Sequence, residues 1–115
     1  MAFTDTEIAE HLKVLENEFW SHRRPPLHLR NQVREGQRFK DQSIELFMVR
    51  PVHNRPGYEV EESIAKVRYV RNQDVWRIFW KRGDGHWHSY EPHPLADSLA
   101  DALRVINTDP HCCFF

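Results

Sequence analysis

Glycine is scarce in this chain, with only four among 115 residues, so the sequence cannot supply a Gly-rich phosphate-binding loop. Cysteine is scarcer still, because the only two are the adjacent Cys112 and Cys113. Neighbouring cysteines rarely bridge each other, so no intrachain disulfide framework is expected. Long apolar runs are also missing, and none approaches the roughly 20 residues that a membrane-spanning helix needs.

The remaining composition is that of an ordinary globular protein, with 40% hydrophobic and 29% charged residues. Its length predicts a single domain over residues 1–115. The N-terminus is polar and acidic and lacks the basic-then-apolar plan of a signal peptide, and the cysteine usage suits a reducing compartment. We therefore expect a cytoplasmic location and no membrane partner.

The small net charge of −1 hides a segregation along the chain. Residues 1–22 carry a net charge of −4, residues 23–82 carry +7, and residues 83–115 carry −4. If the acidic helices lie against a basic sheet, their opposite charges neutralise one another. Alternatively, the basic middle forms a cationic surface that meets an anion such as nucleic acid.

The stretch Val75–Pro92 holds three of the four tryptophans and alternates at period two on both sides of Gly83-Asp84-Gly85. This pattern predicts a β-hairpin. Successive strand side chains point to opposite faces, so one face is apolar and the other mixes an aromatic ring with cations. The apolar face carries Trp76, Ile78 and Trp80; the opposite face carries Arg77, Phe79 and Lys81.

Three further strands are predicted at residues Gln32–Lys40, Ser43–Arg50 and Glu62–Arg71. Gly36 weakens the first or marks a bulge, Pro51 ends the pairing of the second, and residues 53–60 form an exposed loop. In the third strand Ile64 is expected to share a face with Lys66 and Arg68. Together these strands predict an antiparallel meander of about four or five strands.

Two amphipathic helices flank the predicted sheet. A capping box of Thr4 and Glu7 starts the first helix, expected from Asp5 to Ser21, and Asp97 or Ser98 caps the second. Their apolar stripes are Ile8, Leu12, Leu15 and Phe19 in the first, and Leu99, Ala102, Leu103 and Ile106 in the second. The apolar tail that ends in Phe114 and Phe115 is expected to dock. The fold class is therefore α+β: helix, meander, helix.

Basic and aromatic residues interleave on the predicted strands, as in sheets that hold nucleic-acid phosphates with cations and stack bases on rings. The candidate nucleic-acid-binding residues are Arg68, Arg71, Arg77, Phe79, Lys81 and Arg82. This prediction depends on the helices. If both pack on the tryptophan face, the Phe79 face is free; if they split between the faces, it is covered.

His86 and His88 lie two residues apart, so both imidazoles fall on one strand face and could chelate a zinc ion. His93, and also His111 or Cys112, could complete a tetrahedral site, which would suit a metal-dependent hydrolase. Neither a CxxC nor an HExxH motif is present. The alternative is that His86 and His88 are half-exposed strand residues among aromatic neighbours.

Arg23 and Arg24 precede two prolines and could grip a carboxylate or a phosphate. Equally, they could neutralise the negative end of the first helix dipole.

Several short motifs together resemble those of a small bacterial family, domain of unknown function 3024. They are Phe19-Trp20, Arg23-Arg24-Pro25-Pro26, Arg50-Pro51, Ile64-Ala65-Lys66, Trp76, Trp80, Arg82-x-Asp84, Trp87-His88-x-Tyr90, and Asp109-Pro110 with Cys113-Phe114-Phe115. The resemblance covers nearly the whole chain. It implies a short bacterial protein of one domain and brings no activity, cofactor or catalytic residue with it.

The sequence thus favours a non-enzymatic binding or interaction module without a cofactor, with nucleic acid as one candidate ligand. A protein–protein adaptor or homodimer and a metal-dependent hydrolase remain the alternatives.

Overall fold

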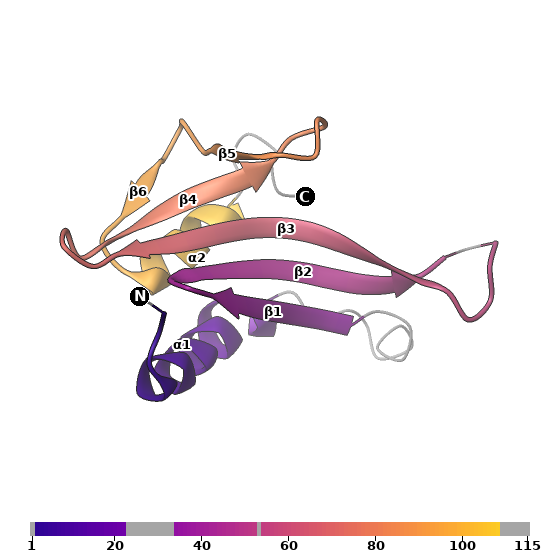
Figure 1. Cartoon of the computed structure of the whole chain (residues 1–115), viewed down its shortest axis with the longest axis horizontal. Helices are drawn as coiled ribbons and strands as arrows, with labels where there is room; N and C mark the ends of the chain where they lie inside the picture. Colours follow the sequence, from indigo (N-terminus) through magenta and orange to yellow (C-terminus); the bar gives the residue numbers. More distant parts are fainter. Residues whose placement is uncertain (1, 23–33, 53, 109–115) are drawn as a thin grey trace.

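A computed structural model describes residues 2–22, 34–52 and 54–108 of the chain. It confirms the α+β class: an N-terminal helix, an antiparallel sheet of six strands and a C-terminal helix (Figure 1). The elements are α1 (Asp5–Glu18), a 3-10 turn (Trp20–His22), β1 (Arg34–Lys40), β2 (Ser43–Pro51), β3 (Glu59–Val70), β4 (Val75–Lys81), β5 (Trp87–Ser89), β6 (Leu95–Ala96) and α2 (Leu99–Thr108).

The sheet is a meander in which each strand pairs antiparallel with the next, in the order β1-β2-β3-β4-β5. The predicted tryptophan hairpin is confirmed as β4 and β5, and its turn is closed by a hydrogen bond from the Arg82 amide to the His86 carbonyl. Short strand β6 was not predicted. It pairs with the start of β4, beside β5, because the Ile78 amide donates to the Pro94 carbonyl and holds the chain there.

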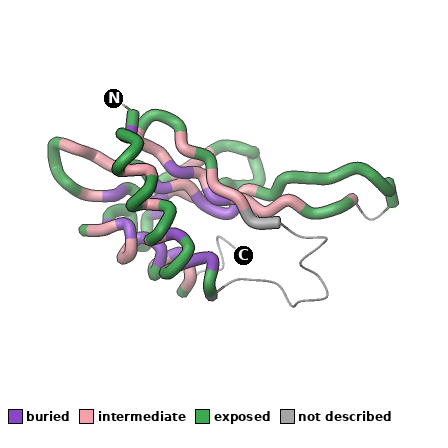
Figure 2. Tube along the Cα trace, turned by 90° about the horizontal axis from the view of Figure 1, so that it is seen from below, coloured by how far each residue is buried: buried purple, intermediate pink, exposed green. Residues whose placement is uncertain are grey.

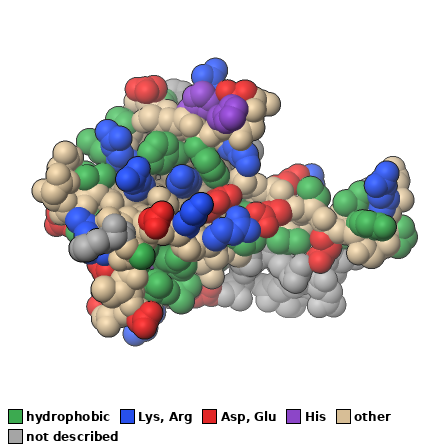
Figure 3. Space-filling model, in the orientation of Figure 1, with side chains coloured by type: hydrophobic (Ala, Val, Ile, Leu, Met, Phe, Trp, Pro, Cys, Tyr) green, Lys and Arg blue, Asp and Glu red, His purple; other side chains and the backbone are tan. Residues whose placement is uncertain are grey.

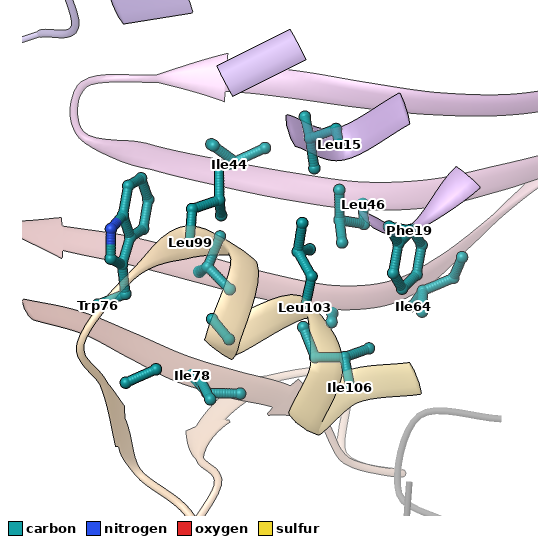
Figure 4. Close-up of a cluster of buried hydrophobic side chains, with 14 of the residues drawn as sticks. Leu15, Phe19, Ile44, Leu46, Ile64, Trp76, Ile78, Leu99, Leu103 and Ile106 are labelled. Carbon is teal, nitrogen blue, oxygen red and sulfur yellow. The ribbon is translucent and has the colours of Figure 1, made fainter. Parts of the chain in front are cut away.

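Both helices lie on the same side of the sheet, and no helix of the described residues lies on the opposite side (Figure 2). The core fills the space between them. Leu99, Leu103 and Ile106 of α2 point toward the sheet, while Leu15 and Phe19 enter from the α1 side (Figure 4). Trp76 is only 4% exposed, whereas Trp80 is partly buried at the edge of the core. Within the described part of the chain, this two-layer arrangement leaves one sheet face without a covering helix, and we call it the uncovered face.

Helix α1 begins as predicted, since the Thr4 hydroxyl accepts from the Glu7 amide and the Glu7 carboxylate accepts from the Thr4 amide. The predicted apolar stripe is wrong at Leu12, which is 38% exposed. His11 takes the inward position instead, edge-on to the rings of Phe3 and Trp76. Burial lowers the pKa of His11, which favours the neutral form of the imidazole beside these two rings.

Helix α2 follows the prediction closely. Ser98 caps it, because its hydroxyl accepts from the Asp101 amide and its carbonyl from the Ala102 amide. The whole predicted stripe is buried: Leu99, Ala102, Leu103 and Ile106.

Two details of the β2–β3 pair differ from the predictions. The register shifts between Leu46 and Phe47, so Ile64 is an extra residue in β3 and turns into the core next to Ala65, instead of sharing a face with Lys66. Pairing also continues through Pro51, which faces Glu59. Proline lacks an N–H but keeps its carbonyl, and the hairpin closes beyond it with a hydrogen bond from the Val52 amide to the Tyr58 carbonyl.

This β2–β3 hairpin extends past the helices as an arm (Figures 1 and 2). Its tip lies in the loop expected to be exposed, and the Tyr58 side chain there is 63% exposed. Gly36, in contrast, lies in an uninterrupted β1. A Cβ at that position would come within 2.6 Å of the Phe47 ring, so the glycine gives the ring room to lie against the neighbouring backbone.

Several predictions fall outside the described residues: the Arg23–Arg24 site, the start of the first strand at residues 32–33, and docking of the tail at residues 109–115. In the described part of the chain, no helix is both long and apolar enough to cross a membrane.

Candidate nucleic-acid interface

The uncovered face of the sheet carries side chains that face outward from neighbouring strands in register. One cross-strand row runs from Arg38 through Glu45, Lys66 and Phe79 to Ser89. A second row, nearer the arm, contains Gly36, Phe47 and Ser63, with Lys81 and Trp87 beyond Ser63. Because alternate residues of a strand point to the same side, the composition of this face is set by five separate stretches of sequence, one for each of β1 to β5.

Three aromatic rings on this face each have a cation above them. The Arg38 guanidinium carbon lies 4.8 Å from the Phe47 ring centre. The Lys66 ammonium lies 5.9 Å from the Phe79 ring centre, and the Lys81 ammonium 5.6 Å from that of Trp87. All three rings are partly exposed. We call these three rings and three cations the aromatic platform; cation–ring contacts within about 6 Å are attractive.

Positive charge dominates the outward side chains. In Figure 3 Lys and Arg side chains gather across the middle of this face, among hydrophobic groups. Arg38 is paired, at 3.0 Å to Glu61 and 3.5 Å to Glu45, and these carboxylates raise its pKa further. The other cations of the face make no ion pair with any carboxylate in the described part of the chain: Lys40, Lys66, Arg68, Arg77 and Lys81.

A third row lies next to the turns and contains no aromatic ring. It comprises Lys40, Ser43, Arg68 and Arg77, one residue from each of β1 to β4, and we call it the arginine row. Two hollows flank Arg68. One of about 570 Å³ is also lined by Lys40 and Lys66, and one of about 440 Å³ is also lined by Arg77. Gln42 lines both.

The structure brings four of the six predicted nucleic-acid-binding residues together on this face: Arg68, Arg77, Phe79 and Lys81. The other two side chains, Arg71 and Arg82, turn to the helix side, because each lies two residues beyond a side chain that points to that side. Arg82 lies 5.5 Å from the Trp80 ring centre. Arg71 forms two hydrogen bonds with the Glu7 carboxylate of α1, at 2.7 and 2.9 Å.

The Arg71–Glu7 pair predicts a pH dependence of stability. Hydrogen bonding to Arg71 lowers the pKa of Glu7 to about 2, with help from the Thr4 amide. The pair therefore contributes stability above the ordinary glutamate pKa of 4.5, and this contribution is lost as the pH falls towards 2. In thermal unfolding across this range, Glu7→Gln should lose less stability on acidification than the parent protein.

Glu10→Gln is the matched control, since it removes an exposed carboxylate from the same helix. An acid profile of Glu7→Gln that coincides with the parent profile would mean that the pair does not couple α1 to the sheet.

Four members of the aromatic platform were not predicted from the sequence: Arg38, Phe47, Lys66 and Trp87. Lys66 lies two residues before Arg68 on the same strand, so the alternation of side chains alone predicts that both point to the same face. Arg38 and Phe47 can be placed on this face only when the pairing of β1 with β2 is known. Trp87 can be placed only when the pairing of β4 with the short β5 is known, because there it faces Lys81.

The geometry supports the predicted zinc site at His86 and His88 less well than the nucleic-acid interface. Asp84 organises the turn: one carboxylate oxygen accepts from the His86 amide and the other lies 2.9 Å from His88 Nε2. The His86 amide is the main cause of the lowered pKa of Asp84. The described residues contain no group of three or more His, Cys, Asp or Glu side chains placed to hold a metal ion, and His111 and Cys112 lie outside them.

Comparison with known protein families identifies one to which the chain is similar. A family model described as "Domain of unknown function (DUF3024)" matches residues 3–115. No curated protein matches the chain, and neither does any solved structure. The match spans nearly the entire sequence, as the resemblance of its short motifs implied, and the chain therefore belongs to the DUF3024 family.

Proposed function

We propose that this protein binds single-stranded nucleic acid on the uncovered face of its sheet. The observation that carries the proposal is the aromatic platform: three partly exposed rings, each beneath a cation, on the face that neither helix covers. The proposed activity is binding without catalysis. It assumes the cytoplasmic location expected from the sequence, where nucleic acid is available.

The spacing of the platform suits such a ligand. Neighbouring strands lie about 4.8 Å apart, and rows separated by two residues lie about 6.7 Å apart along a strand. Phe79 on β4 and Phe47 on β2 lie one row and two strands apart, so each could stack a different base. Stacking needs an exposed base face, which a single strand offers and an intact duplex does not. The cations that are free of carboxylates would then meet phosphates.

A binding titration at two salt concentrations tests the proposal. A fluorescent oligouridylate should bind the parent protein, and its affinity should fall with salt as counterions are released. Removing two phosphate contacts with Arg77→Ala and Lys81→Ala should reduce the slope of log K against log salt by about 1.4. The double variant should therefore bind roughly 25-fold more weakly at about 0.1 M salt and nearly as well as the parent at about 1 M.

The matched control is Lys13→Ala with Arg104→Ala, which removes the same charge from the two helices. If the two double variants weaken binding equally, only net charge matters, and the platform has no special role. If the parent protein does not bind at low salt, the proposal fails.

A protein partner is the second candidate, favoured by the arm. Tyr58 is 63% exposed and Val60 41% exposed, beyond the reach of the core. A dimer mass in light scattering that reverts to a monomer mass in Tyr58→Ser would support an interaction surface there.

A further inference from the structure

Arg68 and Arg77 face each other directly across β3 and β4. Like charges in directly opposite positions of an antiparallel pair destabilise the sheet. Neither guanidinium has a carboxylate partner among the described residues, although salt bridges elsewhere engage Arg38, Arg50 and Arg71. Lys40 adds a third cation at the far end of the same row. An anion bound here would relieve a repulsion that the free protein carries.

The hollows beside this row give an anion space. Arg68 lines both hollows. The first is also lined by Lys40 and Lys66, but Asp41 and Glu45 line it as well. The second is lined by Arg77 and by no acidic residue of the described chain, so it suits an anion better. The hollow that both arginines line, at about 440 Å³, exceeds what one phosphate group needs. A phosphate attached to a sugar could therefore enter it.

The arginine row also lies near one end of the proposed binding face. Beyond it β1 and β2 join at the turn of Asp41 and Gln42, while β3 and β4 add one apolar pair, Val70 and Val75, before the turn at residues 71–74. Moving in the other direction, the next two rows carry the rings of Phe79 and Phe47. A strand whose bases stack on those rings would place a phosphate without a stacked base on the arginine row.

We propose that the arginine row binds the terminal phosphomonoester of a nucleic-acid strand. This inference rests on the proposed function and identifies which strands the face prefers. A phosphomonoester carries about −1.5 to −2 charges at neutral pH, whereas an internal phosphodiester carries about −1. The two positive charges of the opposed arginines balance the charge of a terminal phosphomonoester better than that of an internal phosphodiester. Each planar guanidinium can also donate two hydrogen bonds to its oxygens.

Three versions of one oligouridylate test the inference: with a 5′-phosphate, with a 3′-phosphate, and with hydroxyls at both ends. One added charge contact is worth about fivefold in affinity at 0.1 M salt, so one phosphorylated form should bind about fivefold more tightly than the hydroxyl form. The preference should shrink below about pH 6, where the terminal group loses its second charge. Whichever end is preferred gives the direction of the strand on the sheet.

Arg77→Thr should abolish this preference, so that all three forms bind alike and more weakly than to the parent protein, whereas Lys81→Thr should weaken all three forms alike and keep the preference. Inorganic phosphate should raise the melting temperature of the parent protein above that in chloride of equal ionic strength, without any oligonucleotide. Equal binding of all three forms to the parent protein would overturn the inference and leave the proposed function standing. Binding of none of them would contradict the proposed function itself.

Discussion

Replacing Leu103 by alanine is expected to lower the free energy of unfolding by about 2 to 5 kcal/mol. Leu103 is fully buried on α2 and points from that helix toward the sheet (Figure 4). Truncation removes buried apolar surface and leaves a cavity that β2 and β3 cannot close, because their inward side chains are held in register. Domains of this size are typically stable by only about 5 to 15 kcal/mol, so the loss should be easily measured by urea unfolding.

Leu12→Ala is the matched control, because it makes the same chemical change at a position of α1 that is 38% exposed. Its effect should stay within about 0.5 kcal/mol, since alanine is also the better helix former. Similar losses in the two variants would contradict the burial of Leu103 between α2 and the sheet and the exposure of Leu12.

Replacing Phe79 by leucine is expected to weaken the binding of single-stranded RNA by about 1 to 3 kcal/mol, or roughly 5- to 150-fold. Leucine keeps the apolar bulk but loses the flat face on which a base would stack. No charge is removed, so the salt dependence of binding should stay the same. The expected result thus differs from that of the Arg77 and Lys81 variants, which change the slope.

Phe79→Tyr should retain most of the affinity, because it keeps the ring. Tyr58→Leu, which removes an exposed ring from the arm, should leave binding unchanged. If Phe79→Leu and the parent protein bind RNA equally well, the platform does not stack bases.

Much of the fold follows from periodicity in the sequence. The alternation around Trp76 predicted β4 and its faces, and the glycines of the Gly83–Gly85 turn marked the reversal into β5. The capping box fixed the start of α1, and the stripe around Leu103 fixed the buried face of α2. Each of these signals is local, so the rest of the fold does not need to be known.

The errors arise where distant parts of the chain decide the outcome. The bulge beside Phe47 depends on how β2 pairs with β3, and it reverses the expected direction of Ile64. Strand β6 has two residues and so shows no period. On α1, packing against Phe3 and Trp76 selected His11 in place of Leu12 for the inward position.

The candidate site was predictable strand by strand. Alternation placed Arg77, Phe79 and Lys81 on one face, but it could not show whether a helix covers them. That answer depends on α1 and α2 packing on the same side. The partners across the sheet, such as Phe47 opposite Gly36, appear only once the register is known.

The most direct test of the account is an NMR titration of the protein with short single-stranded RNA. Amide and ring signals of the uncovered face should shift, above all those of Arg68, Phe79 and Trp87. Signals of Leu15 and Leu103, beneath the sheet, should stay in place. Shifts confined to the helices or the arm, or no shifts at all at low salt, would contradict the claim that this face binds nucleic acid.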